Sequence, residues 1–429
     1  MTTTRSIPGI PQELTAEILN HLWDDENALK ACSLACRAFL HTSQQHLFSK
    51  IVLWKGLPGH RFRDLLRSSP HLSLYVEYFE VSDLHGSWVW NDRTSISFCL
   101  SCLSNLRALV FHYPLEDLEE TRWNNIIEEG LLDSLIDTLH LPSLTYLNLF
   151  CFPPALLIKH GRNLTHLVVE SDFTESYTSH NISSTCCTSQ EKISMDFLQV
   201  NIVDEGVERP RTLQDLYNTV DVTTLKRFSG CGDVGIKCHH DLWSFMKACA
   251  GTLEELDFEP CSDAHIPEIS TMDPIDWSTM TALRVLRIRL EVTTPARGPM
   301  INQFPWFMTL LDKLSPPNTR LEELVVHVNY AFCGQKIEVH HWAKLSALLL
   351  DRNRFPRLRK VEFWIAAFVA DDVEEIMLQV NRQTIFLRES SRLRVTLVHV
   401  KPFAHLSFFL PDPTWISRDP LMDLDDKSY

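Results

Sequence analysis

The chain has 429 residues, of which 45% are hydrophobic and 22% charged, ordinary values for a globular protein with several domains or a long repeat array. Its formal net charge of −15 argues against a phosphate-binding surface spread over the whole molecule, so we expect no nucleic-acid partner. The best candidate for a membrane span, 361–370, is too short and contains Glu362, and no signal-peptide layout is visible. Twelve cysteines without framework spacing suit a reducing compartment, so we expect a soluble protein of the cytoplasm, the nucleus or both.

The stretch from Ile7 to Val52 predicts three short helices. Pro11 suits the first turn of a helix, and apolar residues then recur at four-residue spacing. This stripe consists of Leu14, Ile18 and Leu22. Asn27 is expected to cap the second helix. The residues that share one face of this helix are Ala28, Cys32, Ala35 and Phe39. Thr42 or Ser43 is expected to cap the third helix. Such a unit has a small core, so we expect it to bury its remaining apolar face against a partner.

The same stretch carries a family motif. Ile-Pro-x-Glu-Leu-x-x-x-Ile-Leu-x-x-Leu is followed by Leu-Lys-Ala-Cys-Ser-Leu-Ala-Cys-Arg-Ala-Phe and then by Leu-Phe. This resembles the F-box, which has a Leu-Pro pair, an Ile-Leu-x-x-Leu helix and a Val-Cys-Arg-x-Trp-like second helix. Ile10, Ala35 and Phe39 stand where the family usually has Leu, Val and Trp, and all three stay apolar. A generic helical N-terminal subdomain is the alternative.

F-box proteins dock on the Skp-family adaptor of cullin–RING ubiquitin ligases. On the matching positions, the resemblance implies adaptor contacts at Ile10, Pro11, Leu14, Ile18, Leu19, Leu22, Leu29, Leu34, Cys36 and Phe39. It further implies a substrate-receptor subunit of an SCF-type ligase, which holds an unknown protein substrate and has no catalytic residue of its own. The alternative is an interaction scaffold that uses the same adaptor contact without promoting ubiquitination.

After the helices, one phrase recurs: a helix-like segment followed by Leu-x-x-Leu-x-Leu or a near relative. The clearest copies are 103–111, 141–149, 163–169, 252–258, 282–288, 320–326 and 357–363, and the weaker ones are 75–81, 224–230 and 392–398. The last two apolar residues of the phrase are two apart, so in a strand they point to the same face. Helical segments are expected between copies at 131–139, 241–250, 306–314 and 341–351.

Stacked strand-and-helix units build a continuous core that no single unit can form. The predicted fold is therefore α/β, a small three-helix F-box followed by an irregular leucine-rich-repeat solenoid with concave strands and convex helices. An ordinary α/β domain with Leu-rich strands is the alternative. The expected parts are the module 7–52, a connector 53–70 that includes a helix with Phe62, Leu65 and Leu66 inward, the repeats 71–410, and a disordered tail 411–429. A polar insertion is expected near 171–190, followed by an irregular strand or hairpin at 192–203.

Solenoids bind ligands through the outward-facing residues of their strands. The phrase places twelve residues there: Asn148, Phe150, Val168, Glu170, Asp257, Glu259, Arg287, Arg289, Val325, His327, Glu362 and Trp364. The candidate substrate contacts among them are Phe150, Glu170, Arg287, Arg289, His327 and Trp364, with the two aromatic residues expected to be exposed. A structural alternative is that Asp257 faces Arg287 and Glu259 faces Arg289 in cross-strand pairs that stabilise the sheet.

Catalytic motifs are absent from the sequence: it has no phosphate-cradling Gly-rich loop, no G-x-S-x-G elbow and no H-E-x-x-H helix. Cys99-x-x-Cys102 lies in an apolar run and is expected to pack in the core. Residues of the types that bind metals are close together in the sequence at Cys231, Cys238, His239 and His240. Adjacent histidines point in different directions, so we expect no metal and no cofactor. A metal-dependent or thiol enzyme at this group is the remaining alternative.

Overall fold

The structure is a computed structural model that describes residues 11–54, 58–82, 88–112, 130–150, 160–172, 192–203, 216–218, 220–233, 236–259, 277–293, 301–314, 320–331, 339–367, 370–390 and 393–400. The chain divides into two compact units. The described part of unit 1 runs from Pro11 to Phe150 and includes His160–Asn163, and that of unit 2 runs from Leu164 to Val400. Both are α/β.

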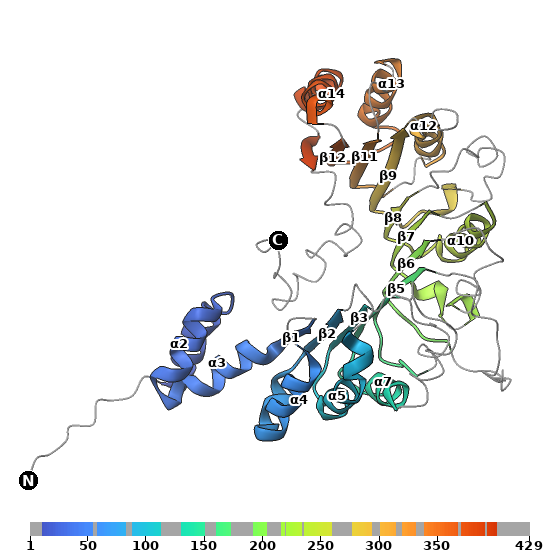
Figure 1. The fold of residues 1–429 in the computed structure, drawn as a ribbon. Helices are drawn as coiled ribbons and strands as arrows, with labels where there is room; N and C mark the ends of the chain where they lie inside the picture. The colour runs from blue at the N-terminus through green and yellow to red at the C-terminus, as the bar shows by residue number, and fades with distance from the viewer. Residues whose placement is uncertain are drawn as a thin grey trace, which may run out of the picture. The chain divides into compact units, whose positions relative to one another are not determined.

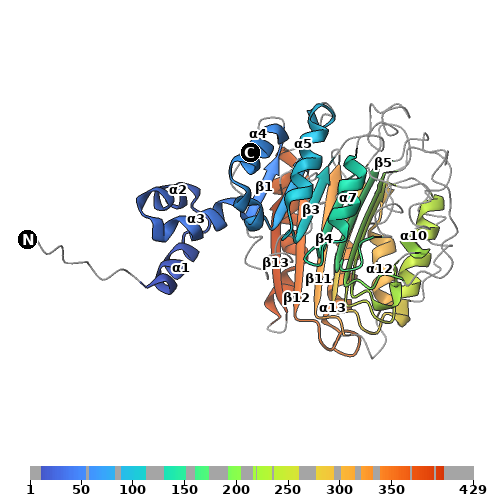
Figure 2. The same ribbon diagram turned by 90° about the horizontal axis from the view of Figure 1, so that it is seen from below.

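Unit 1 begins with three helices and continues as a layer of parallel strands. Its elements are α1 (Gln12–Asn20), α2 (Glu26–Ala35), α3 (Arg37–Ser49), β1 (Lys50–Leu53), α4 (Gly59–Ser68), the 3-10 helix η1 (Pro70–Tyr75), β2 (Tyr78–Ser82), α5 (Trp88–Cys102), β3 (Ala108–His112), α7 (Leu131–Leu139) and β4 (Tyr146–Phe150). The strands pair in chain order, and α4, α5 and α7 lie along one face of them (Figure 1). Figure 2 shows how α3 leads directly into β1.

Unit 2 repeats the arrangement of strand and helix several times. Its strands are β5 (His166–Asp172), β6 (Phe197–Val203), β7 (Arg227–Asp233), β8 (Glu255–Phe258), β9 (Val285–Thr293), β10 (Ile301–Asn302), β11 (Glu323–Ala331), β12 (Lys360–Ala367) and β13 (Arg394–Val400). Its helices are η2 (Val222–Thr224), α10 (Ile236–Cys249), η3 (Trp277–Thr279), α12 (Phe304–Lys313), α13 (Val339–Leu350), α14 (Ala370–Gln383) and α15 (Ile385–Glu389). All strands pair in parallel and in chain order, except that β10 pairs antiparallel with β9 beside the main path.

The core of unit 2 lies between its strands and the helices on one face of them. Figure 1 shows α10, α12, α13 and α14 along this face. Leu286 and Ile288 of β9 are fully buried toward it, whereas Arg287 between them is only half-buried. Aromatic rings fill the layer between helices and strands: Trp342 of α13 lies 5.0 Å from Phe304 of α12 and 5.4 Å from Phe363 of β12, measured between ring centroids. The period of two in the strands therefore decides which side chains enter the core.

The α/β prediction and the position of the strands are confirmed. Every copy of the phrase, including the three weaker ones, overlaps a described strand, and all four expected helical segments overlap helices. A strand is present within 192–203, as expected, but β6 is a regular parallel strand between β5 and β7 and neither irregular nor a hairpin. Stacked parallel strand–helix units are compatible with a solenoid, and the assignment of the units to leucine-rich repeats stays a prediction.

Several boundaries differ from those expected. The second helix is capped by Asp25, whose carboxylate accepts a hydrogen bond from the Ala28 N–H at 2.9 Å, and not by Asn27. It ends at Ala35 because Cys36 is extended, so the third helix begins at Arg37 and already includes Phe39. The expected caps Thr42 and Ser43 thus lie inside α3.

The connector and helix expected at 53–70 contain Leu53, which ends β1, and the helix α4. β1 starts at Lys50, and α4 packs Phe62 and Leu66 inward while Leu65 is exposed, which corrects its expected direction. Ser171 and Asp172 end β5, and the remainder of the expected insertion and the tail at 411–429 lie outside the described residues. None of the described helices is long and apolar enough to cross a membrane.

Candidate functional site

The α1–α3 module has a small core of its own. Leu19 of α1 and Leu29 of α2 are 0% and 1% exposed. Thr15 is buried beside them and donates its hydroxyl to the Pro11 carbonyl at 3.2 Å. A hydrogen bond of 2.9 Å between Asn20 Oδ1 and His46 Nε2 ties α1 to α3. Two large buried side chains stabilise such a unit only modestly, so much of its apolar surface is left outside.

The exposed apolar surface of the module comes from all three helices. Leu14 and Ile18, one turn apart on α1, are 50% and 48% exposed, and Leu34 near the end of α2 is 88% exposed. Leu40 of α3 is also exposed, a position that the motif did not indicate. Fully burying a leucine or isoleucine is worth about 1.5–3 kcal/mol, so a partner that covers these residues would gain several kilocalories per mole.

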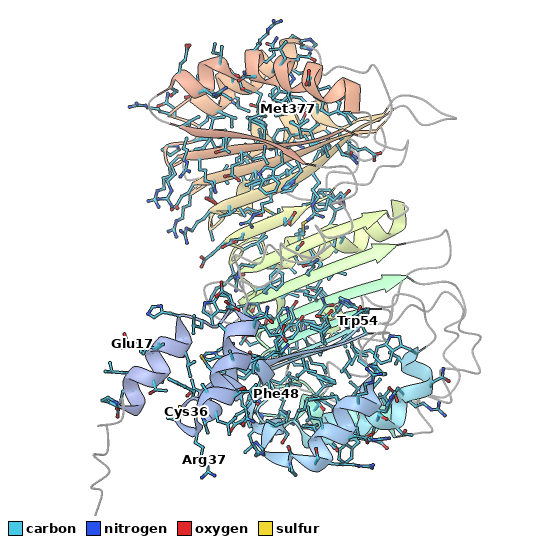
Figure 3. The ribbon with its side chains drawn as sticks, turned by 60° about the vertical axis from the view of Figure 1, so that its left-hand side comes forward. Glu17, Cys36, Arg37, Phe48, Trp54 and Met377 are labelled. Carbon is cyan, nitrogen blue, oxygen red and sulfur yellow. The ribbon has the colours of Figure 1, made fainter. Side chains whose placement is uncertain are left out.

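The structure separates the predicted adaptor contacts into two groups. Those that remain accessible are Pro11, Leu14, Ile18, Leu34 and Cys36, which are exposed, and Leu22 and Phe39, which are half-buried. The predicted adaptor contacts at Leu19 and Leu29 must be corrected, because both side chains form the core of the module and offer no surface to a partner. Ile10 lies outside the described residues. Cys36 and Arg37 mark the junction of α2 and α3 in Figure 3.

The second candidate surface is the face of the unit 2 strands that points away from the helices. The predicted register is confirmed here, since Asp257 of β8 lies opposite Arg287 of β9. Two ion pairs nevertheless run diagonally, since Arg287 Nη1 lies 3.3 Å from Glu255 and Arg289 lies 3.1 Å from Asp257. The third is the predicted pair of Arg289 and Glu259, at 3.4 Å. These arginines are held in cross-strand pairs, so the structural alternative accounts for them better than a direct contact with substrate.

His327 and Trp364 lie beside these pairs on β11 and β12. They are opposite in register, and their ring centroids are 5.1 Å apart. The Trp364 indole N–H donates to Glu362 at 3.2 Å, and Lys360 Nζ lies within 3.2 Å of the same carboxylate. Trp364 is thus half-buried and not the exposed aromatic that we expected.

The remaining predicted positions give no candidate contact. Asn148, Val168 and Val325 were expected to face outward, but all three are buried. Phe150 and Glu170 lie on β4 and β5, and the structure does not describe their side chains. Alternation along a strand fixes the face on which a side chain lies, but not whether other parts of the chain cover that face.

A further line of charges lies at the start of the strands, and the sequence analysis missed it. Arg284 lies 3.6 Å from Glu254 and 3.3 Å from Glu322, which in turn lies 2.8 Å from Arg359. We call these four residues the edge ladder. The hydrogen bond that Arg284 donates to Glu322 lowers the pKa of Glu322 and raises the pKa of Arg284. The signal was present, because successive phrases carry Glu, Arg, Glu and Arg after their first leucine.

No catalytic grouping emerges from the described residues. Among them, no cluster of three or more His, Cys, Asp or Glu side chains could hold a metal ion. Cys99 is fully buried, as predicted, and burial raises the pKa of its thiol to about 12. Cys231 lies on β7 and 238–240 lie on α10, and their side chains are not described.

No model of a known protein family matches the chain. No curated protein matches it either.

Proposed function

We propose that this protein is a non-catalytic substrate receptor of an SCF-type ubiquitin ligase. The α1–α3 module would dock on the Skp-family adaptor, and the strand face of unit 2 would hold a protein substrate. The observation that carries the proposal is the exposed apolar group Leu14, Ile18 and Leu34 on a helical module that bears an F-box-like motif. Exposed apolar surface of this kind marks interaction sites.

The mechanism would be proximity. A receptor that holds a substrate lysine near a thioester on another subunit raises the effective concentration of that lysine. No acid, base or nucleophile is then required from this chain. On the strand face, His327 and Trp364 are better candidates for substrate contact than Arg287 and Arg289, which are already held in ion pairs.

The test is co-purification with the Skp-family adaptor. The double variant Leu14→Asp, Ile18→Asp should lose at least about 100-fold in affinity, because two charges would replace central apolar contacts. Both side chains are about half exposed, so the core of the module should remain folded. Leu378→Asp is the matched control, since Leu378 of α14 is 48% exposed but lies in unit 2.

Wild-type protein that stays monodisperse and ignores the adaptor would contradict the proposal. If the adaptor binds, a reconstituted ligase assay with proteins that co-purify separates the two readings of the motif. Ubiquitination of such a protein supports the receptor, whereas stable binding without transfer identifies a scaffold.

A further inference from the structure

Two histidines meet at the end of α7 in unit 1. His140 directly follows α7, and His160 begins the described turn 160–163, which belongs to the same unit. Nδ1 of His160 lies 3.2 Å from Nε2 of His140, and the ring centroids are 5.0 Å apart with the rings nearly perpendicular. The sequence analysis considered only metal-ligand types that are close together in the chain, so it missed this pair, whose members are 20 residues apart.

Hydrogen bonds hold the backbone near both rings. The His140 N–H closes the last turn of α7. Asn163 Nδ2 donates to the Leu141 carbonyl at 3.5 Å, which ties the turn to the residue after His140. Within the turn, the Arg162 N–H donates to the His160 carbonyl at 3.1 Å. The two rings are therefore brought together by the backbone and not only by their own contact.

The separation of the two nitrogens suits two ligands of one metal ion. Zn²⁺ binds histidine nitrogens at about 2.0–2.1 Å in tetrahedral geometry, which places two such nitrogens about 3.3 Å apart. In the hydrogen bond seen here, one ring donates its N–H and the other accepts it. If the donor ring moves this proton to its other nitrogen, both rings stay neutral and each presents a lone pair to the ion.

The end of a helix is also a favourable place for a cation. The last carbonyl groups of α7 form the negative pole of the helix. Asp137, one turn before His140, is exposed and adds a negative charge to the same end. The exposed Arg162 in the turn acts in the opposite direction, so the two imidazoles must supply most of the affinity.

The ligand types indicate which ions the pair would take. Imidazole suits zinc, copper and nickel, whereas Mg²⁺ and Ca²⁺ prefer oxygen ligands. Among the described residues, no third His, Cys, Asp or Glu completes the pair, so these residues supply two ligands. His140 is exposed, so water can occupy further positions on the ion. Such a site is open and exchanges its ion more readily than a four-ligand structural site.

We propose that Nε2 of His140 and Nδ1 of His160 form an open binding site for a divalent ion of the zinc class at the end of α7. The bound ion would fasten the turn 160–163 to the helix. This site does not depend on the proposed ligase role.

The test is a zinc titration of the full-length protein, followed by NMR of isotope-labelled histidine side chains. Free Zn²⁺ is set by a chelator buffer, and the two signals are assigned with the variants His140→Gln and His160→Gln. We expect both signals to shift together, with Nε2 of His140 and Nδ1 of His160 as the metal-bound nitrogens. Mg²⁺ should shift neither signal.

The same variants measure whether the two rings act as one site. Replacing either ring should weaken zinc binding at the other by at least about tenfold, because the second ligand is no longer held in place. His21→Gln, at an exposed position of unit 1, is the matched control, in which His140 and His160 should titrate as in wild type. Unchanged signals from the other histidines verify that each variant is folded.

Three results would overturn the site. The first is that His140 and His160 shift only at zinc concentrations that also shift His21. The second is that one ring binds zinc equally well after the other has been replaced. The third is that zinc binds through the opposite nitrogens of the two rings, which the observed geometry does not bring together.

Discussion

A single arginine and burial together hold His166 in its neutral form. The Arg227 guanidinium lies 2.9 Å from Nε2 of His166, and Thr165 Oγ1 lies 2.8 Å from Nδ1. Burial first, and then the positive charge of Arg227, lower the pKa of His166 from 6.5 to about 4, although Asp196 acts in the opposite direction. Nε2 therefore accepts the hydrogen bond from Arg227. A protonated ring would have no acceptor at Nε2, and its positive charge would repel the guanidinium.

This pair predicts acid sensitivity of unit 2. Between pH 6.5 and 4 the unfolded chain binds a proton at His166 that the folded chain does not, so stability falls as the pH is lowered through this window and levels off below it. The loss should be about 3 kcal/mol, because the shift is about 2.5 pKa units and one unit corresponds to about 1.4 kcal/mol. His166→Gln, which keeps an acceptor but cannot titrate, should remove this part of the pH dependence in urea unfolding.

The control for this experiment is His21→Gln at an exposed position, which should follow wild type through the same window. Since all other titrating groups are common to the proteins, they cancel in the difference between the curves. A constant difference between wild type and His166→Gln from pH 7 to 4 would show that His166 does not carry this effect.

At the scale of elements, sequence reasoning located strands better than it judged surfaces. The leucine phrase predicted the strands from β2 to β13 other than β6 and β10, because a buried row of residues must recur in every stacked unit. It also predicted the register of Asp257 and Arg287. It could not predict the diagonal ion pairs, because a long arginine side chain reaches a neighbouring row as easily as the opposite residue. On α1, the four-residue stripe was visible, but the inward direction of Leu19 depends on packing against α2 and α3.

The edge ladder makes a prediction at this scale. Arg284→Glu would place a new carboxylate between those of Glu254 and Glu322, and would leave Arg359 as the remaining cation of the ladder. We expect a loss of about 1 kcal/mol or less at low salt, because the pairs are partly exposed. Added salt should shrink the effect by screening like charges. Thermal unfolding with and without salt measures it.

Arg352→Glu is the matched control, because Arg352 is exposed and has no ion pair among the described residues. If Arg284→Glu and Arg352→Glu lower the stability by the same amount and respond equally to salt, the edge ladder contributes nothing to stability beyond the change in net charge.

At the scale of the molecule, the described part of unit 2 is an array in which strands that are adjacent in sequence are also adjacent in the sheet. Each strand of the main path bonds to the strands before and after it on that path, β9 bonds in addition to β10, and each helix covers a short part of the layer. Stability in such an array is approximately a sum of local terms and nearest-neighbour interfaces, so damage should remain local. The aromatic group around Trp342 is a suitable test position, since this fully buried indole contacts rings from both α12 and β12.

Trp342→Ala should therefore open unit 2 unevenly. We expect a local loss of about 3–5 kcal/mol, because a large cavity replaces the indole. Hydrogen exchange should become much faster in α12, β11 and β12, but change little in β6, which is several strands away along the array. Trp54→Ala, at a tryptophan that is 56% exposed and labelled in Figure 3, is the control and should leave exchange in all these elements unchanged. If β6 loses as much protection as β12, unit 2 unfolds as one cooperative block, and the nearest-neighbour description of the array is wrong.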